Sequence, residues 1–416
     1  MIRKLLPFAL CLSLILFLSL AVDAQAQQGG KLKVGRLTII PSLGLQEEYN
    51  DNIYYASGIP NNPTELEESD WITHVMPGIL FDYTLDGRGS VWLGYQGDLA
   101  YYNDNDNNDW KNHRAFFGLD YQAPSGLIVG IDNTYVDTSD PLGSDNQYKL
   151  GLPQTDRWSN ALRTRLGWNF SDRFKVLGYY NYYKQDYDLL TDYSQDYDYN
   201  EGGLGLQMKV MPKTWAFVRY LYGSRDYYTH PAGFGVNESN DADFEWHRAE
   251  AGLTWDTGAK WRGELNLGYQ WKSYENALDP RGLLYDDRDT WVAATQVSYE
   301  ATSTTTLIFR LGRAVRDTGG DSNEYYDDTG VGIGLTQILF TKFTLNAGAG
   351  YSKNEYNLPL VNPRDQDNYL FNVGLDYAIQ DWLTAGIGYD YMRKDSNYNT
   401  DEYKVNRFMV TLRAAY

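Results

Sequence analysis

The chain has 416 residues, and 36 Lys and Arg stand against 55 Asp and Glu, so its formal net charge at pH 7 is −19. This charge would repel a phosphate backbone, and we therefore expect no nucleic-acid partner. The mean hydropathy is −0.53, yet the chain contains 37 Tyr, 12 Trp and 15 Phe. These aromatic residues occur in alternating segments, and such segments can cross a membrane as strands without forming an apolar block.

The N-terminus predicts a secretory signal over residues 1–26. A short basic start precedes the apolar run Leu5–Val22, and small residues favour cleavage after Ala24 or Ala26. A permanent membrane anchor is the alternative, because a run of this length can span a bilayer. Cys11 is the only cysteine and lies in this run. The processed chain is therefore expected to have no disulfide, cysteine nucleophile or cysteine metal site.

Alternation with a period of two continues along the rest of the chain. In WRGELNLGYQWK, residues 261–272, Trp and Leu side chains alternate with Arg, Glu and Asn. The pattern predicts a single-domain, all-β antiparallel transmembrane barrel of about 18 strands over residues 36–416, after a short lead at residues 27–35. The predicted strands are 36–49, 70–84, 89–102, 110–122, 127–137, 157–170, 174–187, 196–210, 214–228, 242–256, 260–274, 288–300, 304–316, 325–337, 342–355, 366–379, 381–394 and 402–416.

The connections between these strands alternate in length. Short turns such as LDGRG, APSG, SDR, MPK and FTK alternate with long polar stretches such as NDNDNND and HPAGFGVNESND. The short ones are typical of hairpin turns. Together with a secretory signal, this arrangement predicts the outer membrane of a Gram-negative bacterium, with the termini and short turns periplasmic and the long acidic loops extracellular.

The last predicted strand, NRFMVTLRAAY, places Phe408, Val410, Leu412 and Tyr416 on one face. An unpaired edge strand would invite aggregation, so we expect it to pair with the first strand and close the sheet. Phe408 and Tyr416 resemble the C-terminal signal that outer-membrane barrels present to the barrel insertion machinery. A soluble β-sandwich or β-helix is the alternative fold, but it would need apolar residues on both faces of many strands.

The opening of the predicted barrel resembles a known family. The segments PSLGLQEEYNDNIYYASG and SDWITHVMPGILFDYTLDGRGSVWLGYQGDLAYY are similar to the first strands of the putative β-barrel porin type 2 family. The matching residues are Tyr49–Asn52 and Asp70–Gly78, with Ile72 in its place. The resemblance implies an outer-membrane component of exopolysaccharide or capsule assembly systems, with periplasmic export components as partners, and it supplies no catalytic residues.

The inward faces of the predicted strands carry most of the functional information. The predicted acidic wall of the lumen contains Asp82, Asp98, Asp120, Asp132, Asp376 and Asp390. The predicted basic wall contains Arg163, Arg165, Lys209, Arg219, Arg248, Arg262, Lys272 and Arg310. Two opposed walls would produce a transverse field across the lumen, whereas local ion pairing within the wall is an equally acceptable interpretation.

Few motifs for other chemistry are present. The four histidines, His74, His113, His230 and His247, have no metal-ligand spacing, and no Ser stands in a G-x-S-x-G setting. We therefore predict no cofactor, metal or catalytic residue. Asp104, Asp106 and Asn108 copy the start of an EF-hand loop, but Asp109 replaces its Gly and Ala115 its Glu. A solvated acidic loop is the default, and weak divalent bridging to lipopolysaccharide is the alternative.

These observations predict a passive channel rather than an enzyme. The leading hypothesis is a conduit for exopolysaccharide, surrounded by outer-membrane lipid and lipopolysaccharide. A general or solute-specific porin is the first alternative, and a non-transporting surface adhesin or scaffold is the second.

Overall fold

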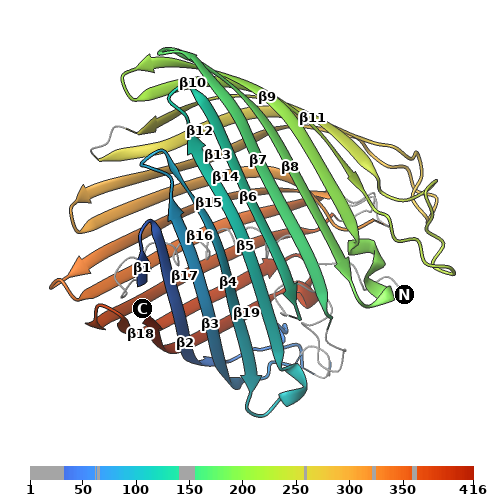
Figure 1. The fold of residues 1–416 in the computed structure, drawn as a ribbon. Helices are drawn as coiled ribbons and strands as arrows, with labels where there is room; N and C mark the ends of the chain where they lie inside the picture. Colours follow the sequence, from blue (N-terminus) through green and yellow to red (C-terminus); the bar gives the residue numbers. More distant parts are fainter. Residues whose placement is uncertain are drawn as a thin grey trace.

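The computed structural model describes residues 32–60, 62, 66–139, 155–256, 260–320, 325–357 and 363–416, and the predicted signal at residues 1–26 lies outside them. Most described residues belong to one antiparallel sheet that closes into a barrel (Figure 1). Its strands are β1 (Leu32–Val34), β2 (Leu37–Asn50), β3 (Asp70–Thr84), β4 (Gly89–Tyr102), β5 (Trp110–Gln122), β6 (Leu127–Thr138), β7 (Arg157–Ser171), β8 (Phe174–Tyr187), β9 (Tyr197–Met211), β10 (Thr214–Asp226), β11 (Phe244–Asp256), β12 (Trp261–Tyr274), β13 (Arg288–Thr302), β14 (Thr305–Asp317), β15 (Tyr325–Leu339), β16 (Phe343–Asn357), β17 (Asp365–Gln380), β18 (Leu383–Ser396) and β19 (Tyr403–Ala415).

The barrel wall consists of β2–β19, which confirms the predicted 18-stranded fold. Consecutive strands pair along the chain, and β19 pairs with β2 from Arg407 opposite Asn50 to Ala415 opposite Ser42. Closure removes the free edges that lipid would penalise. Part of the expected lead forms a strand instead: β1 pairs antiparallel with the first residues of β2. It lies on the same side of β2 as β19 and continues the sheet past Tyr416, whose N–H donates to Pro41 O at 2.9 Å.

Side chains alternate between an outer apolar face and an inner polar face. On β7, Leu166, Trp168 and Phe170 are more than half exposed on the outside, while Arg163 and Arg165 point inward. On β19, Phe408 and Val410 are likewise exposed on the outer face. This is the arrangement expected when every second residue meets lipid. Among the described residues, no helix is long and apolar enough to cross a membrane.

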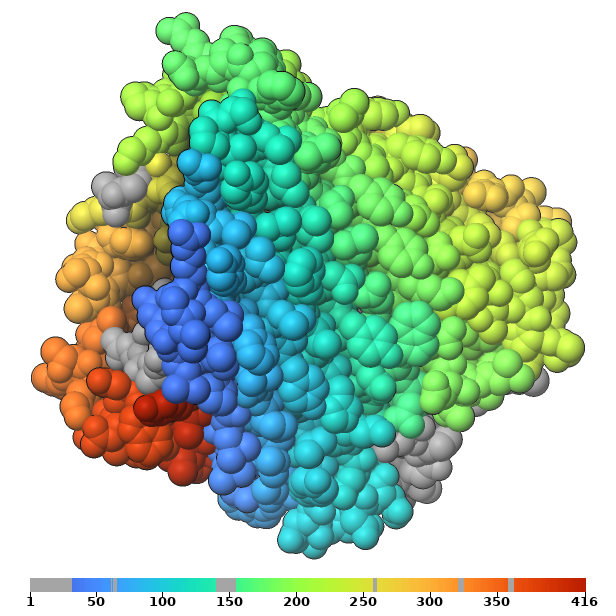
Figure 2. Space-filling model, in the orientation of Figure 1, coloured from blue at the N-terminus to red at the C-terminus, as the bar shows by residue number. Residues whose placement is uncertain are grey.

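The two ends of the barrel differ in their connections. At one end, short turns join β3 to β4, β5 to β6, and each later pair of strands in the same sequence. In the turn between β3 and β4, Asp86 and Gly87 have left-handed backbones (φ 51° and 73°), which is the geometry of a hairpin turn. The other end, here called the long-loop end, carries longer segments and the short helices η2 (Asp106–Asn108), η5 (Leu190–Gln195) and η6 (Asn399–Asp401). Figure 2 shows the outer face of β2–β8, coloured from blue to green, as a closed surface.

Candidate functional site: the lumen and its pocket

The strand register places the charged residues of both predicted walls on the inner face. Asp132 lies opposite Arg163, and Gly130 lies opposite Arg165, on neighbouring strands β6 and β7. Asp390 lies opposite Arg407 on β18 and β19. Several of these side chains remain open to solvent inside the barrel: Arg165 is 45% and Asp120 is 54% exposed. The described lumen therefore leaves room for water beside these charged side chains.

Most of the inner charges are paired with close neighbours. Arg165 Nη2 lies 2.9 Å from Asp120 Oδ2 and joins the two predicted walls where they meet. Arg219 binds Glu250 and lies 3.5 Å from Glu264. Further pairs join Arg248 to Glu201 and Glu250, Arg262 to Glu300, Lys272 to Asp317, Asp98 to His74 and Asp390 to Arg407. Local ion pairing therefore accounts for many charges that side-chain phase alone assigns to opposed walls.

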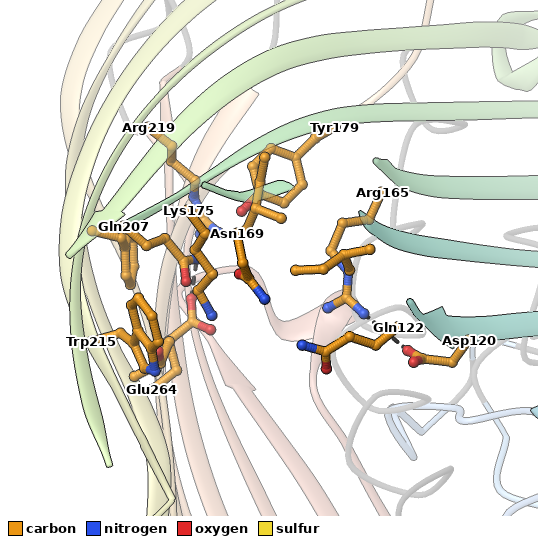
Figure 3. A pocket seen from close by; sticks show the side chains of 14 residues that line it. Asp120, Gln122, Arg165, Asn169, Lys175, Tyr179, Gln207, Trp215, Arg219 and Glu264 are labelled. Carbon is orange, nitrogen blue, oxygen red and sulfur yellow. Dashed lines mark hydrogen bonds and ion pairs between the residues drawn. The ribbon is translucent and has the colours of Figure 1, made fainter. Parts of the chain in front are cut away.

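A pocket of about 570 Å³ opens into the lumen between β5 and β12 (Figure 3). It includes the paired Asp120 and Arg165 on one side, and Glu264 and Arg219 on the other. Amide and hydroxyl groups between them add hydrogen-bonding capacity. The lining residues are Asp120, Gln122, Ile128, Arg165, Asn169, Lys175, Leu177, Tyr179, Gln207, Trp215, Phe217, Arg219, Thr254 and Glu264.

Two lysines lie at one side of this pocket: Lys175 lines it, and Lys209 lies beside the lining residue Trp215. Lys175 Nζ lies 4.1 Å from the centre of the Trp215 ring, and Lys209 Nζ lies 5.9 Å from it. Within the described residues, neither lysine forms an ion pair with a carboxylate. The two cations are held on an aromatic face that attracts them through its quadrupole. We call Lys175, Lys209 and Trp215 the lysine–tryptophan patch, and its chemistry suits a ring that carries an anionic group.

Sequence reasoning placed Lys209 in the lumen but missed Lys175 and Trp215. The predicted inward face was defined as the one opposite the apolar residues, and β8 is apolar on both faces. Val176 and Tyr180 point outward and are exposed, whereas Leu177 and Tyr179 point inward and line the pocket. The inward face of β8 could have been found from its pairing with β7, because residues opposite each other share a face and Arg165 lies opposite Tyr179.

The remaining candidate residues have ordinary structural partners. His74 Nδ1 lies 2.9 Å from Asp98, and His230 Nε2 lies 2.8 Å from Asp241. His113 and His247 each meet a tyrosine hydroxyl on the neighbouring strand, at 2.7 and 2.6 Å. No group of three or more His, Cys, Asp or Glu among the described residues is arranged to hold a metal.

The acidic loop after β4 is organised by hydrogen bonds to a neighbouring strand. Asp70 on β3 accepts bonds from the backbone N–H groups of Asp104 and Asn105, at 3.1 and 2.9 Å. Asp109 Oδ1 accepts the Tyr102 N–H at 2.7 Å. One acidic side chain of the neighbouring strand, Asp70, and one of the loop, Asp109, thus serve as hydrogen-bond acceptors for backbone groups.

An antiparallel barrel with an apolar outer face and a charged lumen with room for water is a porin-like outer-membrane barrel. The chain belongs to the family described as Putative beta-barrel porin 2, whose model matches residues 26–416. No curated protein matches the chain.

Solved structures resemble the chain at low identity. OpdO of Pseudomonas aeruginosa is 10% identical over 91% of this chain and 97% of its own, with a TM-score of 0.45. OpdK from Pseudomonas aeruginosa is 10% identical over 91% and 99%, with a TM-score of 0.46. The siderophore receptor PiuA from Acinetobacter baumannii is 11% identical over 93% and 82%, with a TM-score of 0.43.

Proposed function

We propose that the chain is a passive conduit through the outer membrane for an acidic exopolysaccharide or capsule polymer. The observation that carries this proposal is the lysine–tryptophan patch in a water-accessible pocket. An aromatic face stacks on the apolar side of a sugar ring, and a nearby ammonium group attracts a carboxylate or another acidic substituent. The amides of Gln122, Asn169 and Gln207 in the same pocket suit the hydroxyl groups of a sugar.

The proposal includes an orientation and a set of partners. The long-loop end faces the exterior, and the short turns face the periplasm. A barrel of this kind has no energy source of its own, so periplasmic export components deliver the polymer and drive its passage. The barrel insertion machinery places the chain among outer-membrane lipid and lipopolysaccharide. A lumen with room for water also suits a general or solute-specific porin, which is the second candidate function.

A deletion strain tests the export role directly. The strain lacking this chain is expected to lose surface polysaccharide and to accumulate the polymer or its precursors inside the envelope, and expression of the intact chain should restore export. The measurements are surface and envelope polysaccharide in matched cultures. Unchanged surface polymer would overturn export. The purified barrel then separates the remaining functions, since a porin conducts ions in planar bilayers and a surface adhesin or scaffold does not.

A further inference from the structure

Strands β13 and β14 separate at the long-loop end. Pairing of β12 with β13 continues to Lys272 opposite Arg288, and pairing of β14 with β15 continues to Asp317 opposite Tyr325. Pairing between β13 and β14, however, stops at Ala293 opposite Arg313. The last residues of β14 have therefore left β13. Because unpaired backbone groups are costly, other contacts must compensate for the lost part of the ladder.

The end of β14 lies against inward side chains of β12 and β10, in the neighbouring part of the wall. Asp317 accepts a hydrogen bond from Lys272 Nζ on β12. It also accepts one from the Tyr274 hydroxyl at 3.3 Å, and Arg225 Nη1 on β10 lies 3.7 Å from its carboxylate. Lys272 and Arg225 both point into the lumen. Asp317 therefore fastens the end of β14 inside the barrel.

The residues after Asp317 extend this contact to two other connections. Thr318 O accepts a bond from the Gln195 side chain at 3.1 Å. Gly320 N–H donates to Ser194 O at 2.7 Å, and Gly320 O accepts the Ala242 N–H at 2.9 Å. A Cβ at position 320 would lie 2.5 Å from the Tyr227 ring, so this close approach requires glycine. Residues 317–320, here called the latch, thus lie inside the mouth and reach the β8–β9 and β10–β11 connections.

The site that receives Asp317 contains two cations, Lys272 and Arg225. Lys272 is only 1% exposed, and its Nζ lies 3.9 Å from the Phe244 ring and 4.1 Å from the Tyr274 ring. Arg225 Cζ lies 4.2 Å from the Tyr197 ring. Within the described residues, Asp317 is the carboxylate that pairs with these two cations. Aromatic faces offset part of the cost of burying the second positive charge.

Arg313 bridges the strands on either side of the split. Its guanidinium donates to Thr329 Oγ1 and Asp327 Oδ2 on β15, both at 2.7 Å, and lies 4.7 Å from the Trp291 ring on β13. Arg288 on β13 also binds Asp327. Side chains thus join β13 to β15 in the part of the wall where β13 and β14 are not paired. The wall is held together here, while the end of β14, which stays paired with β15 up to Asp317, lies in the mouth.

We propose that Arg225 and Lys272 form a carboxylate site that Asp317 occupies as a tethered ligand, and that an acidic group of the transported molecule displaces Asp317 and releases the latch. The identity of the displacing ligand rests on the proposed function, whereas the existence of the latch is inferred from the contacts alone. A carboxylate on the polymer has the chemistry of the Asp317 side chain and competes for the same two cations. Arrival of the polymer at the mouth would then open it.

Replacing Asp317 tests the latch without any polymer. In planar bilayers with KCl alone, Asp317→Asn is expected to raise the mean conductance by a clearly measurable fraction, because the buried Lys272 and the partly buried Arg225 lose their counter-charge and repel each other. Asp401→Asn is the matched control, since Asp401 pairs with Arg364 at 2.9 Å at the same end of the barrel. Heat-modifiable mobility verifies that both variants fold. Equal conductance of the wild type and Asp317→Asn would overturn the latch.

A reversible cross-link provides a second test that keeps Asp317 intact. A Cβ at Gly319 would lie 3.4 Å from Ser194 Oγ, so the pair Ser194→Cys and Gly319→Cys is placed to form a disulfide. The oxidised protein is expected to conduct no better than the wild type and to resist opening, and reduction should restore opening. If the oxidised and reduced proteins respond alike to every condition that opens the wild type, the latch does not control the mouth.

Uronate oligomers test the displacement step. Added to the wild type, they are expected to raise the open fraction, whereas neutral glucose oligomers of equal length should not, and the oxidised disulfide variant should respond to neither. If Asp317→Asn opens the channel but uronate leaves the wild type closed, displacement by an acidic polymer is overturned while the latch is retained. Failure of the export test alone would change the identity of the displacing anion and leave the Asp317 result unaffected.

Discussion

Lys175 and Lys209 lie in the lumen, and within the described residues neither forms an ion pair with a carboxylate. Arg165 and Arg219 each have carboxylate partners, so a passing anion must compete with a bound acid for them. The two lysines instead contact Trp215 and keep their charge available to a ligand. Under the proposed function, these two cations would therefore contribute more to the binding of an anion than the paired arginines.

Neutralising this pair should weaken the interaction with acidic sugars. For Lys175→Gln combined with Lys209→Gln, we expect uronate oligomers to bind the purified barrel, as measured by titration calorimetry, with an affinity reduced at least about tenfold, since one hydrogen bond to a charged group contributes about 1.5–3 kcal/mol. The effect should shrink as salt rises. Lys342→Gln, in a short turn outside the pocket, is the control. Equal loss of affinity for neutral oligomers would show that the lysines act on pocket shape and not on charge.

The connections at the long-loop end depend on two carboxylates outside the spanning strands, the buried Asp196 and the half-buried Asp243. Asp196 accepts the Tyr187 N–H at 2.8 Å, and Asp243 accepts the Tyr227 N–H at 2.7 Å. Burial raises the pKa of Asp196 to about 6 and that of Asp243 to about 7. Other acids reinforce both shifts: Asp186 and Asp192 face Asp196, and Asp241, Asp226 and Glu275 face Asp243. Both side chains belong to connections that the latch contacts.

These pKa shifts predict loops that loosen as pH rises. A carboxyl group whose pKa is raised by folding binds more protons in the folded state, so its contribution to stability is greatest below its unfolded pKa near 4 and declines through pH 6–7. Hydrogen exchange, corrected for intrinsic rates, should therefore show less protection of residues 186–196 and 227–243 at pH 8 than at pH 5. Asp243→Asn should reduce this difference in the second segment. Equal protection of the intact chain at both pH values would contradict the assignment.

Strand positions were predictable because lipid imposes a strict local pattern. On β12, outward Leu265 and Leu267 alternate with inward Glu264 and Asn266, and the observed bounds lie within a few residues of the expected ones. The departure of β14 from β13 was not predictable, since it depends on Asp317 meeting Arg225 and Lys272 from distant strands. The β1 strand was missed because three residues are too few to show alternation.

The barrel as a whole depends on the seam between its first and last wall strands. Local hairpins form most of the ladder, whereas β19 and β2 are separated by almost the entire described chain. This contact closes last in any order of assembly that builds hairpins first, because closing the longest loop costs the most conformational entropy. Changes at this seam should therefore affect insertion more than changes of similar size within a hairpin.

Tyr416 provides the test of this closure. Its N–H bonds to Pro41 O, and its ring is 56% exposed beside the outer face of the seam, where an aromatic side chain suits the membrane interface. We expect Tyr416→Asp to lower the amount of protein in the outer membrane severalfold, because it places a charge there and removes the aromatic end of the proposed insertion signal. Tyr416→Phe, which keeps the ring, should be close to the wild type. The amount of protein is measured by quantitative immunoblotting of outer-membrane fractions, and heat-modifiable mobility measures how much of it is folded barrel. Wild-type levels of folded Tyr416→Asp would contradict both the closure argument and the insertion signal.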